Sequence, residues 1–182
     1  MVTKELEIGS FTDERDSQEY KTVRMPDGKI WMAQNLNYEI ENSWRYPNDE
    51  YIGKTYGRLY TWDAAMKACP TGWRLPSKFD WINLGIALGC SFGGWMSFPI
   101  KKLLAKNGWK DSGTDDFGFS ALPGGFRNED GIPFGLGIGC LWWLCTMSLG
   151  DGYADTILMN EIICEINNLS RVGQGCSVRC IQ

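Results

Sequence analysis

The chain has 182 residues and a formal net charge of −4, with its charges scattered along the sequence. This balance argues against nucleic acid or an anionic membrane as a partner, since both attract a basic stripe, and no apolar run reaches the ~20 residues of a membrane span. Nine tryptophans and 22 glycines indicate a loop-rich α+β protein, and the length predicts a single domain over residues 1–182.

The first part of the chain predicts a polar lead-in followed by a β-hairpin. Residues 1–18 are polar and form the lead-in. Residues 20–25 alternate between polar and apolar, as a half-buried strand does, and residues 30–33 return as the second strand. The intervening Pro-Asp-Gly-Lys favours a tight turn. Residues 39–56 are polar and aromatic, and we expect a long surface loop there.

Two helices and a third, shorter one are predicted in the middle of the chain. Residues 63–69 are rich in alanine, and Pro70 stops that helix. Ser77 and Asp80 have the spacing of a capping box, so a second helix begins there and ends at Gly89. Its expected buried residues are Trp81, Leu84, Ile86 and Leu88. The third helix is expected over residues 100–106.

The last third, residues 119–182, predicts only strands and loops. We expect the strands at residues 119–122, 141–147, 154–159, 162–166 and 176–181. A turn or bulge at Pro123-Gly124-Gly125 bends the sheet after the first of them. Trp142 and Trp143 are neighbours on a strand, so their side chains point to opposite faces. One of them belongs to the core, and the other either does the same or flanks a ligand surface.

The residue inventory limits the chemistry available to the protein. Seven cysteines and no histidine are present, which removes Ser–His and Cys–His mechanisms and most zinc sites. No two cysteines have CxxC spacing, so a structural zinc is not expected, and the odd count leaves at least one thiol free. We expect no catalytic residue, no metal and no cofactor.

Five sequence blocks, taken in order, resemble the fibrobacter-type major paralogous domain. They are WMAQNLNY at 31–38, LYTW at 59–62, ACPTGWRLPS at 68–77, GFSALPGGFR at 118–127 and SVRC at 177–180. The resemblance covers roughly residues 11–182. It implies a C-type-lectin-like fold, with two main helices packed on small antiparallel sheets, long loops on one side and the chain ends in adjacent strands. It also implies a disulfide between Cys69 and Cys180 if the protein is exported. In a reducing compartment the same two residues would be buried thiols.

The same resemblance implies a function. Domains of this family serve as variable proteins of diversity-generating retroelements, in which adenine-directed mutagenesis rewrites asparagine codons near the 3′ end of the gene. Where the family is rich in Tyr, Ser and Asn, this chain has aliphatic residues and cysteines. We expect a hypervariable ligand-binding surface made of Leu136, Ile138, Cys140, Leu141, Trp143, Leu144, Cys145, Leu149, Asp151, Tyr153, Asp155, Ile157 and Cys176.

The apolar character of this surface favours a protein or cell-surface ligand over sugar, whose hydroxyls need paired polar groups. Two alternatives are an undiversified carbohydrate-binding or adhesion module of the same fold and a structural spacer. Aspartates at 111, 115, 116, 151 and 155 suggest a calcium site. Leu144 and Cys145, which follow Trp143, are poor ligands for a hard cation, so we do not expect calcium to bind. Formylglycine-generating enzymes share the fold and use paired cysteines, here Cys140 and Cys145, yet this chain is much shorter and lacks histidine. We therefore expect a non-enzymatic protein, at the cell surface or outside the cell as the family favours.

Overall fold

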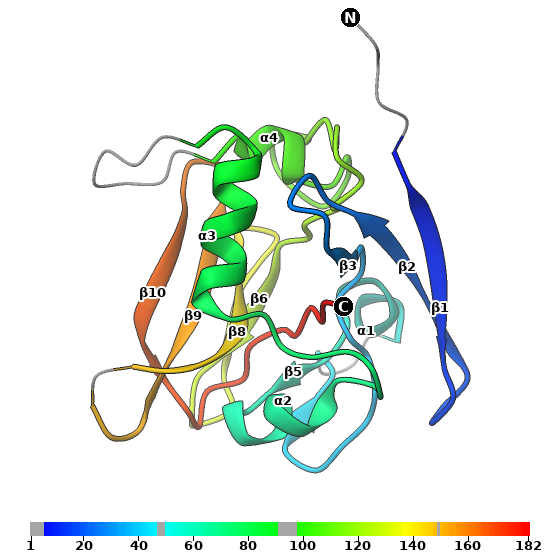
Figure 1. Cartoon of the computed structure of the whole chain (residues 1–182). Helices are drawn as coiled ribbons and strands as arrows, with labels where there is room; N and C mark the ends of the chain where they lie inside the picture. Colours follow the sequence, from blue (N-terminus) through cyan, green and yellow to red (C-terminus); the bar gives the residue numbers. More distant parts are fainter. Residues whose placement is uncertain (1–5, 47–49, 91–97, 149) are drawn as a thin grey trace, which may run out of the picture.

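Residues 6–46, 50–90, 98–148 and 150–182 are described by the structure, which is a computed structural model. The fold is α+β, as the composition predicts (Figure 1). The helices are α1 (Glu50–Tyr56), α2 (Trp62–Ala68), α3 (Lys78–Ala87) and α4 (Ile100–Leu103). The strands are β1 (Ile8–Asp13), β2 (Gln18–Arg24), β3 (Ile30–Met32), β4 (Ser43–Trp44), β5 (Leu59–Tyr60), β6 (Gly124–Arg127), β7 (Pro133–Leu136), β8 (Gly139–Met147), β9 (Tyr153–Asn160) and β10 (Cys164–Arg171).

The N-terminal part of the chain forms a three-stranded antiparallel sheet in the order β1-β2-β3. The hairpin predicted between residues 20 and 33 is confirmed as β2 and β3. The polar lead-in predicted for residues 1–18 is wrong from Ile8 onward, because β1 pairs along its whole length with β2. Only Asp13 of β1 is fully buried. The strand is held by backbone pairing and by Phe11, whose ring lies 5.2 Å from that of Trp73, and one aromatic residue is too little to reveal a strand in the sequence.

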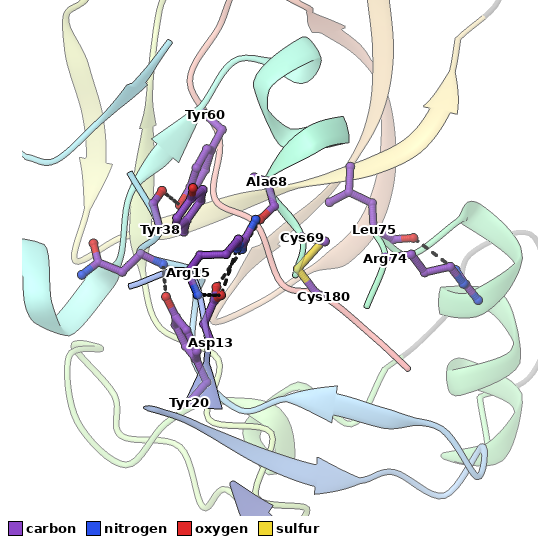
Figure 2. The surroundings of a disulfide bond; sticks show 11 residues. Asp13, Arg15, Tyr20, Tyr38, Tyr60, Ala68, Cys69, Arg74, Leu75 and Cys180 are labelled. Carbon is purple, nitrogen blue, oxygen red and sulfur yellow. Dashed lines mark hydrogen bonds and ion pairs between the residues drawn. A yellow bond between two sulfur atoms is a disulfide. The ribbon is translucent and has the colours of Figure 1, made fainter. Parts of the chain in front are cut away.

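The turn after β1 is fastened to the end of α2. Arg15 donates two hydrogen bonds to the Asp13 carboxylate, at 2.9 and 2.7 Å, and a third to the Ala68 carbonyl at 2.8 Å. Its guanidinium lies 3.7 Å from the centre of the Tyr38 ring. Figure 2 shows this cluster beside the disulfide that joins the residue after α2 to the C-terminal segment. The N-terminal sheet is thereby anchored next to the covalent link.

Both main helices begin with side-chain caps. Thr61 accepts a hydrogen bond from the Ala64 amide at the start of α2, and Ser77 and Asp80 form the predicted capping box at the start of α3. In α3, Trp81 and Leu84 are buried and Leu88 packs against the same core. The expectation that Ile86 is buried is wrong, since it is 52% exposed. Two residues from Leu84 correspond to about 200° around a helix, which places Ile86 on the outer face.

The carboxyl group of Asp80 makes stability depend on pH. Burial alone would raise its pKa, but hydrogen bonds from Arg74 and Ser77 outweigh burial and hold the pKa well below its ordinary value of 3.8. Between the two pKa values the Asp80 carboxyl group is protonated in the unfolded chain and ionised in the folded chain. Its contribution to the free energy of unfolding is therefore complete above about pH 4 and is lost as the pH falls further. We expect Asp80→Asn to lower the free energy of unfolding by about 2 kcal/mol at pH 7.

The measurement for this prediction is urea unfolding between pH 2 and pH 7. Below pH 4, the free energy of unfolding of Asp80→Asn should fall less steeply with decreasing pH than that of the wild type. Asp63→Asn, which changes an exposed carboxyl group in the first turn of α2, is the matched control. Parallel slopes for wild type and Asp80→Asn would show that Asp80 is not the linked group.

The second large sheet has the strand order β10-β9-β8-β6-β7, and α3 lies across one of its faces (Figure 1). Its central strand, β8, separates two cores. The Trp142 ring stacks on Trp81 of α3 at 6.1 Å, while Trp143 faces the opposite core and donates to the Tyr60 carbonyl at 2.6 Å. The prediction of opposite faces is confirmed. Both rings are fully buried, so neither flanks a ligand surface.

The C-terminal segment is not the regular strand predicted for residues 176–181. It makes isolated bridges to β5 at Cys176, to β8 at Ser177 and to β3 at Ile181. Because each stretch pairs with a different neighbour, no continuous ladder forms. The chain end nevertheless lies beside β3, where Ile30 and Gln182 exchange two backbone hydrogen bonds of 3.2 and 2.9 Å.

Other predicted boundaries also differ from the structure. The loop expected over residues 39–56 contains β4 and α1, and the helix expected to reach residue 106 ends at Leu103. The strand predicted at 119–122 is a single bridge between Ala121 and Leu104, because Ser120 has a left-handed φ of 52° that breaks an extended strand, and Arg179 binds the Ser120 carbonyl. At the turn or bulge predicted for residues 123–125, Gly124 donates to the Leu122 carbonyl at 2.8 Å and Gly125 has a φ of 62°, although both glycines belong to β6. β10 begins at Cys164 instead of residue 162.

A buried guanidinium joins the C-terminal segment to the rest of the core. Arg179 is fully buried, and burial lowers its pKa to about 10. It donates to the carbonyls of Phe119 and Ser120, the latter at 3.1 Å, and to Asn35 Oδ1 at 3.2 Å. Its guanidinium also lies over the Phe119 ring at 4.4 Å. Three segments that are distant in sequence therefore converge on one side chain.

Candidate functional site

Most residues predicted to form the ligand surface lie in the interior. The buried ones are Cys140, Leu141, Trp143, Leu144, Asp155, Ile157 and Cys176. Leu149 lies outside the described residues. The expectation that the buried residues contact a ligand from the surface is therefore wrong for this conformation.

The reason for their burial is the pleat of a sheet that is covered on both sides. Consecutive side chains of a strand point to opposite faces. Cys140, Leu144 and Ile157 accordingly pack under α3, while Leu141 and Cys176 belong to the core on the α2 side. The aliphatic and sulfur-containing side chains that looked unusual for a binding surface are ordinary core residues at these positions.

The remaining predicted residues are accessible, but they form two separate groups. Leu136 and Ile138 lie where β7 leads into β8, and Ile138 is 74% exposed. Cys145, Asp151 and Tyr153 lie at the other end of β8, in or near the turn to β9. With a rise of about 3.3 Å per residue, the ends of β8 are roughly 26 Å apart. A small molecule cannot touch both groups.

The group around Leu136 is part of a larger apolar surface that the sequence analysis missed. Phe126 and Phe134 are direct partners across the β6–β7 hairpin, and their rings stack at 5.7 Å. Phe126 and Leu158 both pack at the edge of the core on the α2 side, and Leu136 lies opposite Gly124 in the same hairpin. We call Phe126, Phe134, Leu136 and Leu158 the hairpin face.

The hairpin face is apolar, partly solvent-accessible and bordered by polar groups. Phe134 is 46% exposed, and the other three side chains are half-buried. Glu165 lies directly across from Leu158 on β10, and Asn160 ends β9 nearby. Apolar anchors inside a polar border are typical of a protein-binding surface. The sequence signal was a phenylalanine on each side of a turn rich in Asn, Asp and Gly, at residues 126–134.

The thiols do not form a reactive pair. Cys140 packs in the core under α3, whereas Cys145 packs against the core on the α2 side, so the two face different cores. Burial raises the pKa of both thiols, which disfavours the nucleophilic thiolate. Within the described ranges, no three Cys, Asp or Glu side chains gather to hold a metal ion. Asp115 is instead bound to Ser120, and Asp155 to Ser148.

Fold and site together define a small α+β domain that is closed by the Cys69–Cys180 disulfide and carries an accessible apolar face on its main sheet. The model of the Fibrobacter succinogenes major domain (Fib_succ_major) matches residues 26–182, and the chain belongs to this family. The match begins after β2, so β1 and β2 lie outside it. No curated protein and no solved structure matches the chain. In the described part of the chain, no helix has the length and apolarity needed to cross a membrane.

Proposed function

We propose that this chain is a non-enzymatic binding module with a C-type-lectin-like scaffold. Three observations support the scaffold. Two main helices pack against small, largely antiparallel sheets, the chain end pairs with β3 near the N-terminal hairpin, and a disulfide ties the end of α2 to the C-terminal segment. Such a scaffold holds one sheet face rigid, which reduces the ordering cost of binding.

The hairpin face is the binding surface in this proposal, and its ligand is a protein at a cell surface. The observation that carries the proposal is the stacked Phe126–Phe134 pair, half open to solvent on a strand pair that the fold holds in place. Rigid aromatic side chains desolvate readily and lose little conformational freedom on binding. Ile138, in the turn that follows β7, is a further exposed apolar side chain next to the hairpin.

The first test uses purified protein on an array of defined extracellular proteins and on a glycan array. We expect saturable binding to a protein and none to glycans. Phe134→Asp should weaken binding to that protein at least tenfold, or about 1.4 kcal/mol. Phe79→Asp is the matched control, since Phe79 is 72% exposed on α3, and it should bind like the wild type. Reproducible glycan binding with no protein ligand would favour the carbohydrate-binding alternative.

We further propose that a retroelement diversifies the codons of the binding surface. Fewer positions can vary than the sequence suggested, because many of the predicted surface residues are buried. Substituting a buried residue would disturb the core, so useful variation is limited to accessible positions, of which Leu136 and Ile138 lie in or next to the β6–β7 hairpin. Sequencing the DNA next to the gene tests this. We expect a near-identical repeat that differs at adenines in these codons, together with a reverse-transcriptase gene. Absence of both would remove diversification and leave the binding module.

A further inference from the structure

A cavity lies on the side of the β6–β7 hairpin opposite the hairpin face. Its volume is about 170 Å³, and it is lined by Trp44, Arg45 and Tyr46, by Leu59 of β5, by Arg127 and Pro133 of the hairpin, and by Gly131 of its turn. Arg127 pairs with Pro133 in the register that also pairs Phe126 with Phe134. Because side chains alternate along a strand, this cavity and the hairpin face lie on opposite sides of the hairpin. The cavity is thus separate from the proposed protein-binding surface.

Arg127 brings a positive charge to this cavity without an acidic partner among the described residues. Its guanidinium lies 3.6 Å from the centre of the Trp44 ring, and its Nε is buried without a hydrogen-bond acceptor. The nearby carboxylate of Glu129 is engaged by Arg171, with 3.6 Å between the charged atoms. Stacking occupies one face of the guanidinium and leaves the N–H at Nε, on its edge, without an acceptor in the part of the chain that the structure describes.

Tyr46 adds a second donor without a partner. The residue is 8% exposed, and within the described part of the chain its buried hydroxyl has no hydrogen-bond partner. Burial raises its pKa, so the hydroxyl keeps its proton at neutral pH. Gly125 makes this position possible, since a Cβ there would lie 2.2 Å from the Tyr46 oxygen. A buried hydroxyl and a buried guanidinium nitrogen without acceptors each cost free energy that a ligand would recover.

The donors and the size of the cavity define the ligand. A volume of about 170 Å³ leaves room for a carboxylate with a short carbon stem. A planar carboxylate matches the edge of a guanidinium in a bidentate pair. We propose that this cavity binds a carboxylate group, with Arg127 as the charged donor, Tyr46 as a hydroxyl donor and Trp44 as the platform. Two sources share this chemistry, namely an acidic amino-acid side chain and a sugar acid.

The test follows the Arg127 Nε–H and Trp44 indole N–H signals of the full-length ¹⁵N-labelled protein by NMR at constant ionic strength. The probes are N-acetyl-glutamate amide and glucuronate, with chloride and phosphate as comparison anions. We expect one of the two carboxylates to shift the Arg127 and Trp44 signals saturably, with a Kd on the order of 1 mM. Binding of N-acetyl-glutamate amide would identify an acidic side chain as the source, and binding of glucuronate a sugar acid. Arg127→Lys should raise that Kd at least tenfold and Tyr46→Phe severalfold, while Arg24→Lys, which changes an exposed arginine of β2, should leave it unchanged.

The two conservative variants keep the test decisive, because neither removes much packing. Absence of saturable shifts with both carboxylates would overturn the proposal. Equal shifts with chloride, or tighter binding of phosphate than of either carboxylate, would also overturn it. A Kd unchanged by Arg127→Lys in a folded variant would show that binding occurs elsewhere. Loss of binding to a protein ligand through Phe134→Asp concerns the hairpin face alone, so the two proposals fail independently.

Discussion

Replacing Cys69 and Cys180 by alanine is expected to lower the free energy of unfolding by about 4 kcal/mol. The disulfide joins residues 111 positions apart and therefore restricts most of the unfolded chain. The chain-entropy estimate for a loop of this length is near 4.7 kcal/mol, and measured values often fall below it. Loss of this link would also release the C-terminal segment from the end of α2, where Arg15 binds the Ala68 carbonyl (Figure 2).

Urea unfolding at pH 7 measures this effect, and wild-type protein with its disulfide reduced should behave like the double variant. Cys145→Ser is the matched control, because Cys145 is a free, half-buried thiol whose replacement should cost less than about 1 kcal/mol. A double variant within about 1 kcal/mol of the wild type would show that noncovalent contacts alone hold the C-terminal segment.

Arg179→Met is expected to lower the free energy of unfolding by about 3 kcal/mol. Methionine fills much of the same space, but it leaves the buried carbonyl of Phe119 and the partly buried carbonyl of Ser120 without their Arg179 donor. Each orphaned group costs roughly 1–3 kcal/mol. Removal of a buried charge whose pKa is lowered to about 10 offsets part of this cost. The cost of two carbonyls without a donor exceeds the gain from removing the buried charge, so the free energy of unfolding falls.

Chemical unfolding at pH 7 decides between these opposing effects. Arg24→Met serves as the comparison, since Arg24 binds Glu7 and the Gly28 carbonyl at the surface, and its loss should cost less than about 1 kcal/mol. Arg179→Met as stable as the wild type would mean that desolvating the guanidinium cancels its hydrogen bonds. Arg179 would then not stabilise the convergence of the three segments.

Local signals predicted the elements that local chemistry specifies. The Pro-Asp-Gly turn located the β2–β3 hairpin, the Ser77–Asp80 spacing located the start of α3, and the β8 alternation separated Trp142 from Trp143. The Cys69–Cys180 link came from a family resemblance and could not be derived from spacing. β1 escaped prediction because most of its side chains are exposed and give no alternating apolar pattern. The irregular form of the C-terminal segment escaped prediction because its position depends on backbone pairing with distant partners.

The candidate site was harder to predict, because burial depends on what covers each face of a sheet. Cys140 and Ile138 are two residues apart, yet one lies under α3 and the other is 74% exposed. No local pattern distinguishes them. The cavity at Arg127 depends on Trp44 and Tyr46, about 80 residues earlier in the chain. Only the folded structure brings these side chains together.

Hydrogen–deuterium exchange of the protein, free and saturated with a protein ligand identified on the array, tests the central claim most directly. The account predicts slower exchange in peptides that cover residues 124–138 and 158–166, with α3 unchanged. Phe134→Asp should abolish this protection, whereas Phe79→Asp should keep it. Protection confined to α3 or to the N-terminal sheet would contradict the assignment of the hairpin face as the binding surface.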